Sequence, residues 1–255
     1  MKKISSLLFV LVLMLASFTA GVEYQRGDVN QDGRVSISDV TALVDYLLTG
    51  CWPDDPVTPS DEHEWVNLGL PSGTLWATCN VGATSPEEFG NYFAWGEIEP
   101  KEVYSWATYK WCNGTNETIT KYCTDSSYGI VDNQTYLDPE DDAAYMIWGQ
   151  SWCIPNRAQV EELINNCTWT WTEMNGVNGQ LVTGPNGNTI FLPAAGSRWE
   201  NSTYHRTKGL YWSRTLGASY PVSAFCVYFG SDGAVLDGAD RPDGFTIRAV
   251  RILMN

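Results

Sequence analysis

The sequence has little positive charge. Lysine and arginine account for 15 of its 255 residues, against 30 aspartates and glutamates, so the formal net charge is −15. Proteins that bind nucleic acid or an anionic membrane surface do so with an excess of basic side chains. The charge balance therefore predicts that neither is a partner of this chain.

The sequence also lacks the usual signs of a catalytic site. It has two histidines, His63 and His205, and a histidine-based triad would depend on His205. It contains neither a G-x-S-x-G turn nor a G-x-G-x-x-G loop after a strand-like segment. A pair of carboxylates is the remaining enzymatic option, and no acidic residue stands out from the rest. We therefore expect a protein that is not an enzyme.

No apolar segment is long enough to span a membrane, which takes about 20 residues. The longest, residues 7–16, follows Lys2 and Lys3 and precedes a run of small residues. This order is typical of a secretory signal peptide, which we assign to residues 1–21. We therefore expect a protein that is secreted or located at the cell surface, without a membrane span.

Export permits disulfide bonds, and the sequence has seven cysteines. Their spacing contains no C-x-x-C, so neither a zinc ribbon nor a thioredoxin-like redox pair is indicated. Cys112 and Cys123 are the expected local pair, because Asn113-Gly114 between them can reverse the chain. Because seven is an odd number, at least one cysteine cannot form a disulfide within the chain, and we expect this unpaired cysteine to be Cys51.

An acidic segment follows the expected cleavage site. Residues 28–39 read D-V-N-Q-D-G-R-V-S-I-S-D, with oxygen-bearing side chains at loop positions 1, 3, 5, 9 and 12 and glycine at position 6. This spacing is typical of a calcium loop, in which alternate residues point at one hard cation. An acidic turn that caps a helix without metal is the alternative. The expected Ca²⁺ ligands are Asp28, Asn30, Asp32, Arg34 through its carbonyl, Ser36 and Asp39.

The calcium loop leads into a helical pattern, with apolar residues at 40, 43, 44, 47 and 48 and an end near Gly50. Residues 22–50 together resemble one repeat of a type I dockerin. The resemblance implies calcium binding. Dockerins of cellulosomes use two repeats to bind a cohesin, and we find one here, so a cohesin-like partner stays an open alternative.

Residues 51–63 are rich in proline and acidic residues and are interpreted as an extended linker. Residues 64–255 form the main domain, with strands expected over 190–192, 210–213, 224–229 and 245–253 and a hairpin turn at 231–233. A helix is expected over 156–166, where Asn156 and Gln159 can exchange capping hydrogen bonds, and further helix starts at Ser85-Pro86 and Asp138-Pro139. The prediction is an α+β domain of short antiparallel strands, long loops and few helices.

Several stretches of this domain resemble the FISUMP-type major paralogous domain of secreted bacterial proteins. They are VNLGLPSGTLWATCNVGA (66–83), EEFGNYFAWGE (87–97), DPEDDAAYMIWGQSWCIPN (138–156), FLPAAGSR (191–198) and GFTIRAVRIL (244–253). The resemblance implies a C-type-lectin-like fold, related to that of formylglycine-generating enzymes. It does not imply their activity, because those enzymes use a cysteine pair where residues 209–251 hold only Cys226.

The chain departs from the family pattern at two cysteines. Cys153 stands where we expect arginine, and Cys226 where we expect a strand residue other than cysteine. Two unusual cysteines in one chain suggest a second disulfide, between Cys153 and Cys226.

Aromatic residues supply the candidate ligand site. Trp169 and Trp171 would share one face of a strand over 168–172 and form a platform for a sugar ring. A second group lies where lectin-like folds usually place ligand contacts, in an expected loop that contains Trp199, Tyr204, His205 and Arg206. The alternative is that these rings fill the core.

These observations predict a secreted binding protein of a bacterium, with a glycan or a protein as ligand and a calcium-stabilised dockerin-like segment. One alternative is an accessory enzyme or subunit of a polysaccharide-degrading system, in which two acids, Glu97 and another, would line a cleft. A second alternative is a structural or adhesin subunit.

Overall fold

The structure is a computed structural model that describes residues 63–205, 207–217 and 219–251. The expected signal peptide, the expected dockerin-like segment with all its calcium ligands, and the expected linker up to residue 62 lie outside the described residues, as do Cys51 and Arg206. The elements in chain order are β1 (Trp65–Asn67), β2 (Leu75–Ala77), η1 (Trp106–Thr108), η2 (Pro139–Asp141), α3 (Ala143–Trp148), β3 (Trp152–Cys153), α4 (Arg157–Asn166), β4 (Thr168–Met174), β5 (Val177–Thr183), β6 (Thr189–Pro193), β7 (Ser197–Trp199), β8 (Ser202–Tyr204), β9 (Gly209–Leu216), β10 (Ser223–Gly230), β11 (Gly233–Asp240) and β12 (Val250–Arg251).

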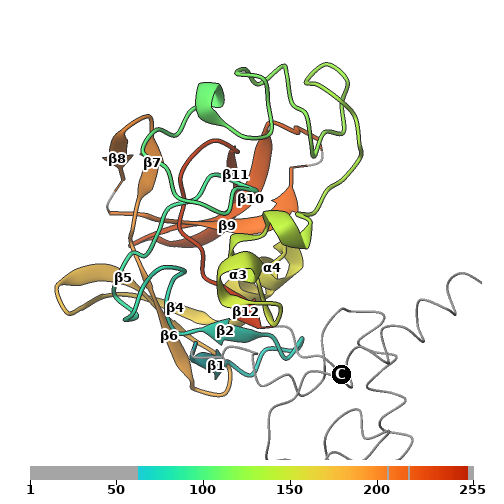
Figure 1. Ribbon diagram of the computed structural model, residues 1–255. Coiled ribbons are helices and arrows are strands. Elements are labelled where there is room, and N and C mark those ends of the chain that lie inside the picture. The colour runs from blue at the N-terminus through green and yellow to red at the C-terminus, as the bar shows by residue number, and fades with distance from the viewer. Residues whose placement is uncertain (1–62, 206, 218, 252–255) are drawn as a thin grey trace, which may run out of the picture. The chain divides into compact units, whose positions relative to one another are not determined.

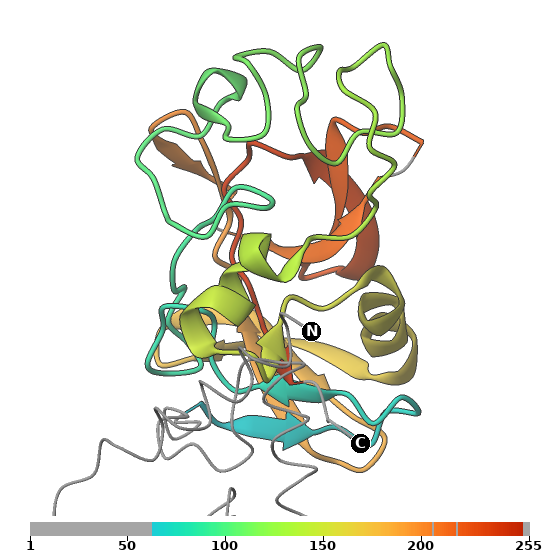
Figure 2. The same ribbon diagram turned by 45° about the vertical axis from the view of Figure 1, so that its right-hand side comes forward.

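The strands form small sheets in which the named strands pair antiparallel. The strand orders are β1-β2-β12-β3, β11-β10-β9 and β4-β5-β6, and β7 and β8 form a separate hairpin. The β9–β11 sheet lies on one side of α3 and α4. The β4–β6 sheet and the four-stranded sheet of β1, β2, β12 and β3 lie on the opposite side (Figures 1 and 2). The predicted architecture of short antiparallel strands, long loops and few helices is confirmed.

Helix α4 forms where the sequence predicts it. The Asn156 side chain accepts a hydrogen bond from the Gln159 backbone N–H at 2.9 Å, and the Gln159 side chain accepts one from the Asn156 N–H at 2.9 Å. Val160 and Leu163 are buried on its inner face. Asp138-Pro139 starts the 3₁₀ helix η2, and Asp142 caps α3. None of the helices in the described ranges has the length and apolar character needed to cross a membrane.

Two element predictions are wrong. Ser85-Pro86 begins a turn rather than a helix, because the Glu88 carboxylate folds back and accepts hydrogen bonds from the backbone N–H of Thr84 and Ser85. The strand expected over 245–253 pairs as a ladder only at Val250–Arg251 within the described residues. Residues before it cross the core through single bridges, Phe93 to Phe245 and Tyr211 to Thr246.

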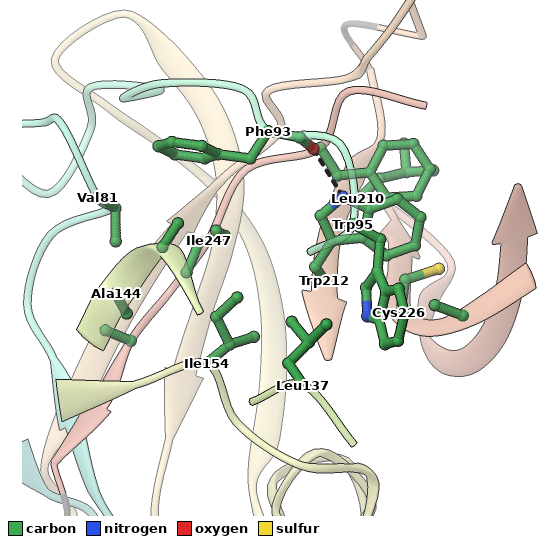
Figure 3. Packing of buried hydrophobic residues seen from close by; sticks show 14 of the residues in the cluster. Val81, Phe93, Trp95, Leu137, Ala144, Ile154, Leu210, Trp212, Cys226 and Ile247 are labelled. Atoms are coloured by element: carbon green, nitrogen blue, oxygen red, sulfur yellow. Dashed lines mark hydrogen bonds between the residues drawn. The ribbon is translucent and has the colours of Figure 1, made fainter. Parts of the chain in front are cut away.

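The main core is built on aromatic side chains between the β9–β11 sheet and the helices. Trp95, Trp152 and Trp212 are at most 1 % exposed, and the Trp212 indole N–H donates to the Phe93 carbonyl at 2.8 Å (Figure 3). Trp95 likewise donates to the Ser213 carbonyl at 2.8 Å. Because the indole N–H groups of Trp95 and Trp212 are both paired, these two rings contribute apolar burial without a desolvated donor.

The side chains of Arg241 and Arg248 are buried, and every hydrogen bond that their guanidinium groups donate goes to an uncharged acceptor. Arg248, in the G-F-x-x-R stretch, donates to the Asn80 side chain and to the carbonyls of Ala77, Thr78 and Phe191. It thereby ties the closing segment of the chain to β2 and β6. The arginine of this stretch has a structural role in this protein.

The expected disulfides are not formed in the structure, where all six cysteines of the described residues are free thiols. The Cys112 Sγ donates to the Trp106 carbonyl at 3.1 Å, and the Cys123 Sγ donates to the Asp125 carbonyl at 3.1 Å, so these two thiols engage different loops. Cys153 and Cys226 pack in different core clusters. Burial raises the pKa of the Cys153 thiol to about 11, which leaves it protonated and unreactive at neutral pH.

Candidate functional site

The site is built on the β7–β8 hairpin, which stands apart from the three larger sheets (Figure 1). Glu200 begins its two-residue connection with a φ of 50°, the left-handed conformation that tight hairpins require. Neighbouring segments hold the hairpin on both sides. Arg198 and Gly244 exchange backbone hydrogen bonds at 2.8 Å, and Glu200 and Tyr104 do so at 2.8 and 2.9 Å.

The second part of the site is a tight turn after β11. The Asp243 backbone N–H donates to the Asp240 carbonyl at 3.0 Å, so the two aspartates stand at the two ends of one turn. Arg241 between them points into the core and is 0 % exposed. Its guanidinium donates to the Tyr109 hydroxyl and to the carbonyls of Lys121, Tyr122 and Pro221, and it lies over the Trp95 ring at 5.0 Å from its centroid. Burial of Arg241 therefore fixes the turn, with Asp240 exposed and Asp243 half-buried at its two ends.

The hairpin and the turn line a wide-open pocket of about 330 Å³. Small-molecule sites usually occupy about 300 to 1,000 Å³, so the pocket is large enough for a small ligand. His205 ends the hairpin with a φ of 57°, a conformation that is uncommon for residues other than glycine. The pocket is lined by Ser197, Trp199, Tyr204, His205, Asp240 and Asp243.

The pocket contains two carboxylic acids, Asp240 and Asp243, whose charge no neighbouring basic side chain of the described residues neutralises. Burial, together with the nearby charge of Asp240, raises the pKa of Asp243 to about 7. Asp240 is largely exposed, yet the chain around it still removes enough water to raise its pKa. No ion pair joins either carboxylate to a basic side chain in residues 63–205, 207–217 and 219–251.

The structure brings together part of the residue set expected from the sequence. Trp199, Tyr204 and His205 do line one pocket, although Trp199 and Tyr204 lie at the ends of paired strands rather than in a loop. Sequence reasoning missed Asp240 and Asp243. The available signal was the turn-forming Arg241-Pro242 between two acids, but only the burial of Arg241 reveals that both carboxylates face the hairpin.

The expected platform of Trp169 and Trp171 does not line this pocket. Both residues do lie on one face of β4, as their alternation predicts, but that face packs on a second core cluster. Trp169 is 5.8 Å from Phe229 between ring centroids. These two rings are half-buried parts of the core, as the alternative interpretation held.

Two further acids, Glu97 and Asp141, have structural partners. Glu97 binds Lys101 at 2.8 Å and accepts from the Lys110 backbone N–H at 2.8 Å, so it is not half of an open carboxylate pair. Asp141 is buried against Lys121 at 2.7 Å and the Tyr122 hydroxyl at 2.7 Å. Across the described part of the chain, no three His, Cys, Asp or Glu side chains are grouped to hold a metal ion.

No protein-family model, curated protein or solved structure matches the chain. The site is therefore interpreted from its own side chains. Trp199 and Tyr204 supply apolar faces, and Asp240, Asp243 and Ser197 supply hydrogen-bonding groups. Such a combination can hold a ligand with an apolar face and several hydroxyl or amino groups.

Proposed function

We propose that this chain is an exported bacterial protein that binds a glycan in the pocket of its main domain. The observation that carries the proposal is the meeting of two aromatic side chains, Trp199 and Tyr204, with two carboxylates in one pocket of about 330 Å³. Aromatic faces stack on the C–H faces of sugar rings, and carboxylates accept hydrogen bonds from sugar hydroxyls. Both requirements are met by side chains on a firmly held hairpin and turn.

The proposal includes a C-type-lectin-like fold of the FISUMP type for residues 64–255. The small antiparallel sheets, the long loops and the two α-helices of the described residues are compatible with it. The structural role of Arg248 supplies a physical reason for the G-F-x-x-R stretch on which part of the resemblance rests.

We also propose that residues 22–50 bind Ca²⁺ as a dockerin-like segment, with a cohesin-like partner as an open alternative. The support is the spacing of oxygen-bearing residues over 28–39. Together with the signal-peptide pattern, this spacing supports a location outside the cell, where calcium is abundant and a glycan ligand is accessible.

The direct test is a glycan array with the full exported chain, followed by titration calorimetry with the best ligand. Trp199→Ala and Tyr204→Ala should each weaken binding by about tenfold to a hundredfold, because each removes a stacking face worth roughly 1.5 to 3 kcal/mol. Trp65→Ala is the matched control, since Trp65 is a 45 % exposed tryptophan on β1 that does not line the pocket. Equal losses in all three variants, or no glycan bound, would contradict the proposal.

A second candidate, hydrolysis of a glycosidic bond, is favoured by the Asp240–Asp243 pair. Glycosidases use two carboxyl groups, of which one keeps its proton near neutral pH, and Asp243 has a pKa of about 7. Asp243→Asn separates the two functions. In an enzyme it abolishes release of reducing sugar while the glycan still binds, whereas in a binding protein wild type releases no sugar and the variant binds less tightly.

A further inference from the structure

The pocket has an unbalanced charge. Its described lining includes two aspartates and no lysine or arginine. Three arginines are sequence neighbours of lining residues, and the two that the structure describes, Arg198 and Arg241, are turned away from the pocket, while Arg206 lies outside the described residues. Arg198 directs its guanidinium to the carbonyls of Lys101 and Glu102, at 3.5 and 3.3 Å, and Arg241 is bonded within the core. Within residues 63–205, 207–217 and 219–251, no lysine or arginine neutralises the two carboxylates, so a cationic ligand would find negative charge there.

The two carboxylates are held near each other at a cost in free energy. The turn joins Asp240 to Asp243 by one backbone hydrogen bond, and the buried Arg241 between them prevents the turn from opening. Burial, and after it the charge of Asp240, raises the pKa of Asp243 to about 7, so a second negative charge beside Asp240 is unfavourable. A bound cation would favour the ionised form of Asp243 and would offset both causes.

The aromatic side chains favour the same kind of ligand. The π-face of tryptophan or tyrosine attracts an ammonium group as well as the C–H face of a sugar, and the attraction grows when water is excluded. Trp199 is half-buried and Tyr204 is 45 % exposed beside the carboxylates. The carboxylates and the aromatic rings therefore both favour a ligand in which a cationic group is attached to an apolar ring face.

We infer that the pocket selects a sugar residue that carries a free amino group, as in a glycan containing de-acetylated hexosamine. The inference rests on the proposed function, because it names the substrate class of the same site. An ammonium on the sugar ring would lie between Asp240 and Asp243 while the ring stacks on Trp199. An acetylated amine offers the same ring without the charge, and an acidic sugar would be repelled by both carboxylates.

The test compares two ligands that differ only in acetylation, the tetramers of glucosamine and of N-acetylglucosamine. Calorimetry with the full exported chain at neutral pH should show at least tenfold tighter binding of the glucosamine tetramer. Asp240→Asn and Asp243→Asn should each reduce this preference to about threefold or less. Glu140→Gln, which removes an equal charge at an exposed position outside the pocket, should leave it unchanged.

The ligand comparison in wild type stands even if an aspartate variant fails to fold, and added salt gives a second measurement. The preference should fall between 50 and 500 mM salt, while binding of the acetylated tetramer should change little. Equal affinity for the two tetramers, or tighter binding of the acetylated one, would overturn the inference and leave glycan binding intact. If no glycan of any kind binds, the proposed function fails as well.

Discussion

Arg241 connects the core of the domain to its candidate site. It carries a full charge at 0 % exposure and pairs with no carboxylate of the described residues. A hydroxyl, three carbonyls and the faces of Trp95 and Tyr109 surround the guanidinium instead. A buried charge is tolerated when all its donors are paired in this way. Since Asp240 and Asp243 flank this residue, its burial also sets where their carboxylates stand.

Arg241→Met should therefore destabilise the domain. The substitution leaves the Tyr109 hydroxyl and the carbonyls of Lys121, Tyr122 and Pro221 without their donor, and each buried unpaired group costs roughly 1 to 3 kcal/mol. Removal of the buried charge offsets part of this cost, so we expect the free energy of unfolding to fall by about 2 to 5 kcal/mol in urea titrations.

Arg157→Met is the control for this change. Arg157 is 48 % exposed and pairs with Glu161 one helical turn away, so its loss should change the free energy of unfolding by less than about 1 kcal/mol. Equal stability of the two variants would mean that the bonds of Arg241 contribute nothing beyond those of a surface arginine.

At the scale of elements, helix α4 shows where local signals suffice. Its cap, its apolar face and its end all lie within residues 156–166, so one short stretch of sequence determines it. The hairpin turn between β10 and β11 is similarly local, with Gly233 at a φ of 118°.

Removal of the α4 cap tests the contribution of this local signal. Asn156→Ala deletes the acceptor for the Gln159 N–H and should lower the free energy of unfolding by about 1 kcal/mol. Asn165→Ala, at an exposed position near the end of the same helix, is the matched control and should be neutral or slightly stabilising. Thermal denaturation followed by circular dichroism would measure both. A loss in the second variant as large as in the first would contradict a specific role for the cap.

Elements that depend on distant segments could not be predicted in the same way. Residues 245–249 alternate like a strand, but their partners are single residues such as Phe93 and Tyr211, far away in sequence, so no continuous ladder forms. The acid pair of the pocket is a similar case. Asp240 and Asp243 are two of 30 acidic residues, and only the bonds of Arg241 to loop residues more than a hundred positions earlier distinguish them.

Over the whole molecule, an acidic chain with a net charge of −15 keeps some of its carboxylates away from water. Burial raises the pKa of Asp142 to about 6, although it accepts backbone hydrogen bonds from Ala144, Tyr145 and Ile154. Burial and the charge of Asp240 raise the pKa of Asp243 to about 7. An aspartate in an unfolded chain titrates near 3.8, so the folded domain binds protons more tightly than the unfolded chain.

This difference sets the direction in which stability changes with pH. Stability gained by protonation of the folded state is fully present below pH about 4 and is lost as the pH rises through about 6 and 7. We expect the free energy of unfolding to fall by about 2 to 3 kcal/mol between pH 5 and pH 8, less than the full shifts would give because Asp243 keeps part of its hydration. The carboxylates with lowered pKa values, such as Glu88 and Asp125, titrate below this window and do not oppose the trend.

Urea titrations of the full chain across this pH range measure the effect, and one substitution assigns it. Asp243→Asn should be more stable than wild type at pH 8 and close to it at pH 5, because the amide needs no proton to stay neutral. Glu140→Gln is the control, because Glu140 is exposed and outside the pocket. It measures how much stability any loss of one negative charge adds to this acidic protein. A wild-type stability that rises from pH 5 to pH 8 would mean that Asp142 and Asp243 ionise as easily in the folded domain as in the unfolded chain. The repulsion that we expect an amino sugar to relieve would then be absent.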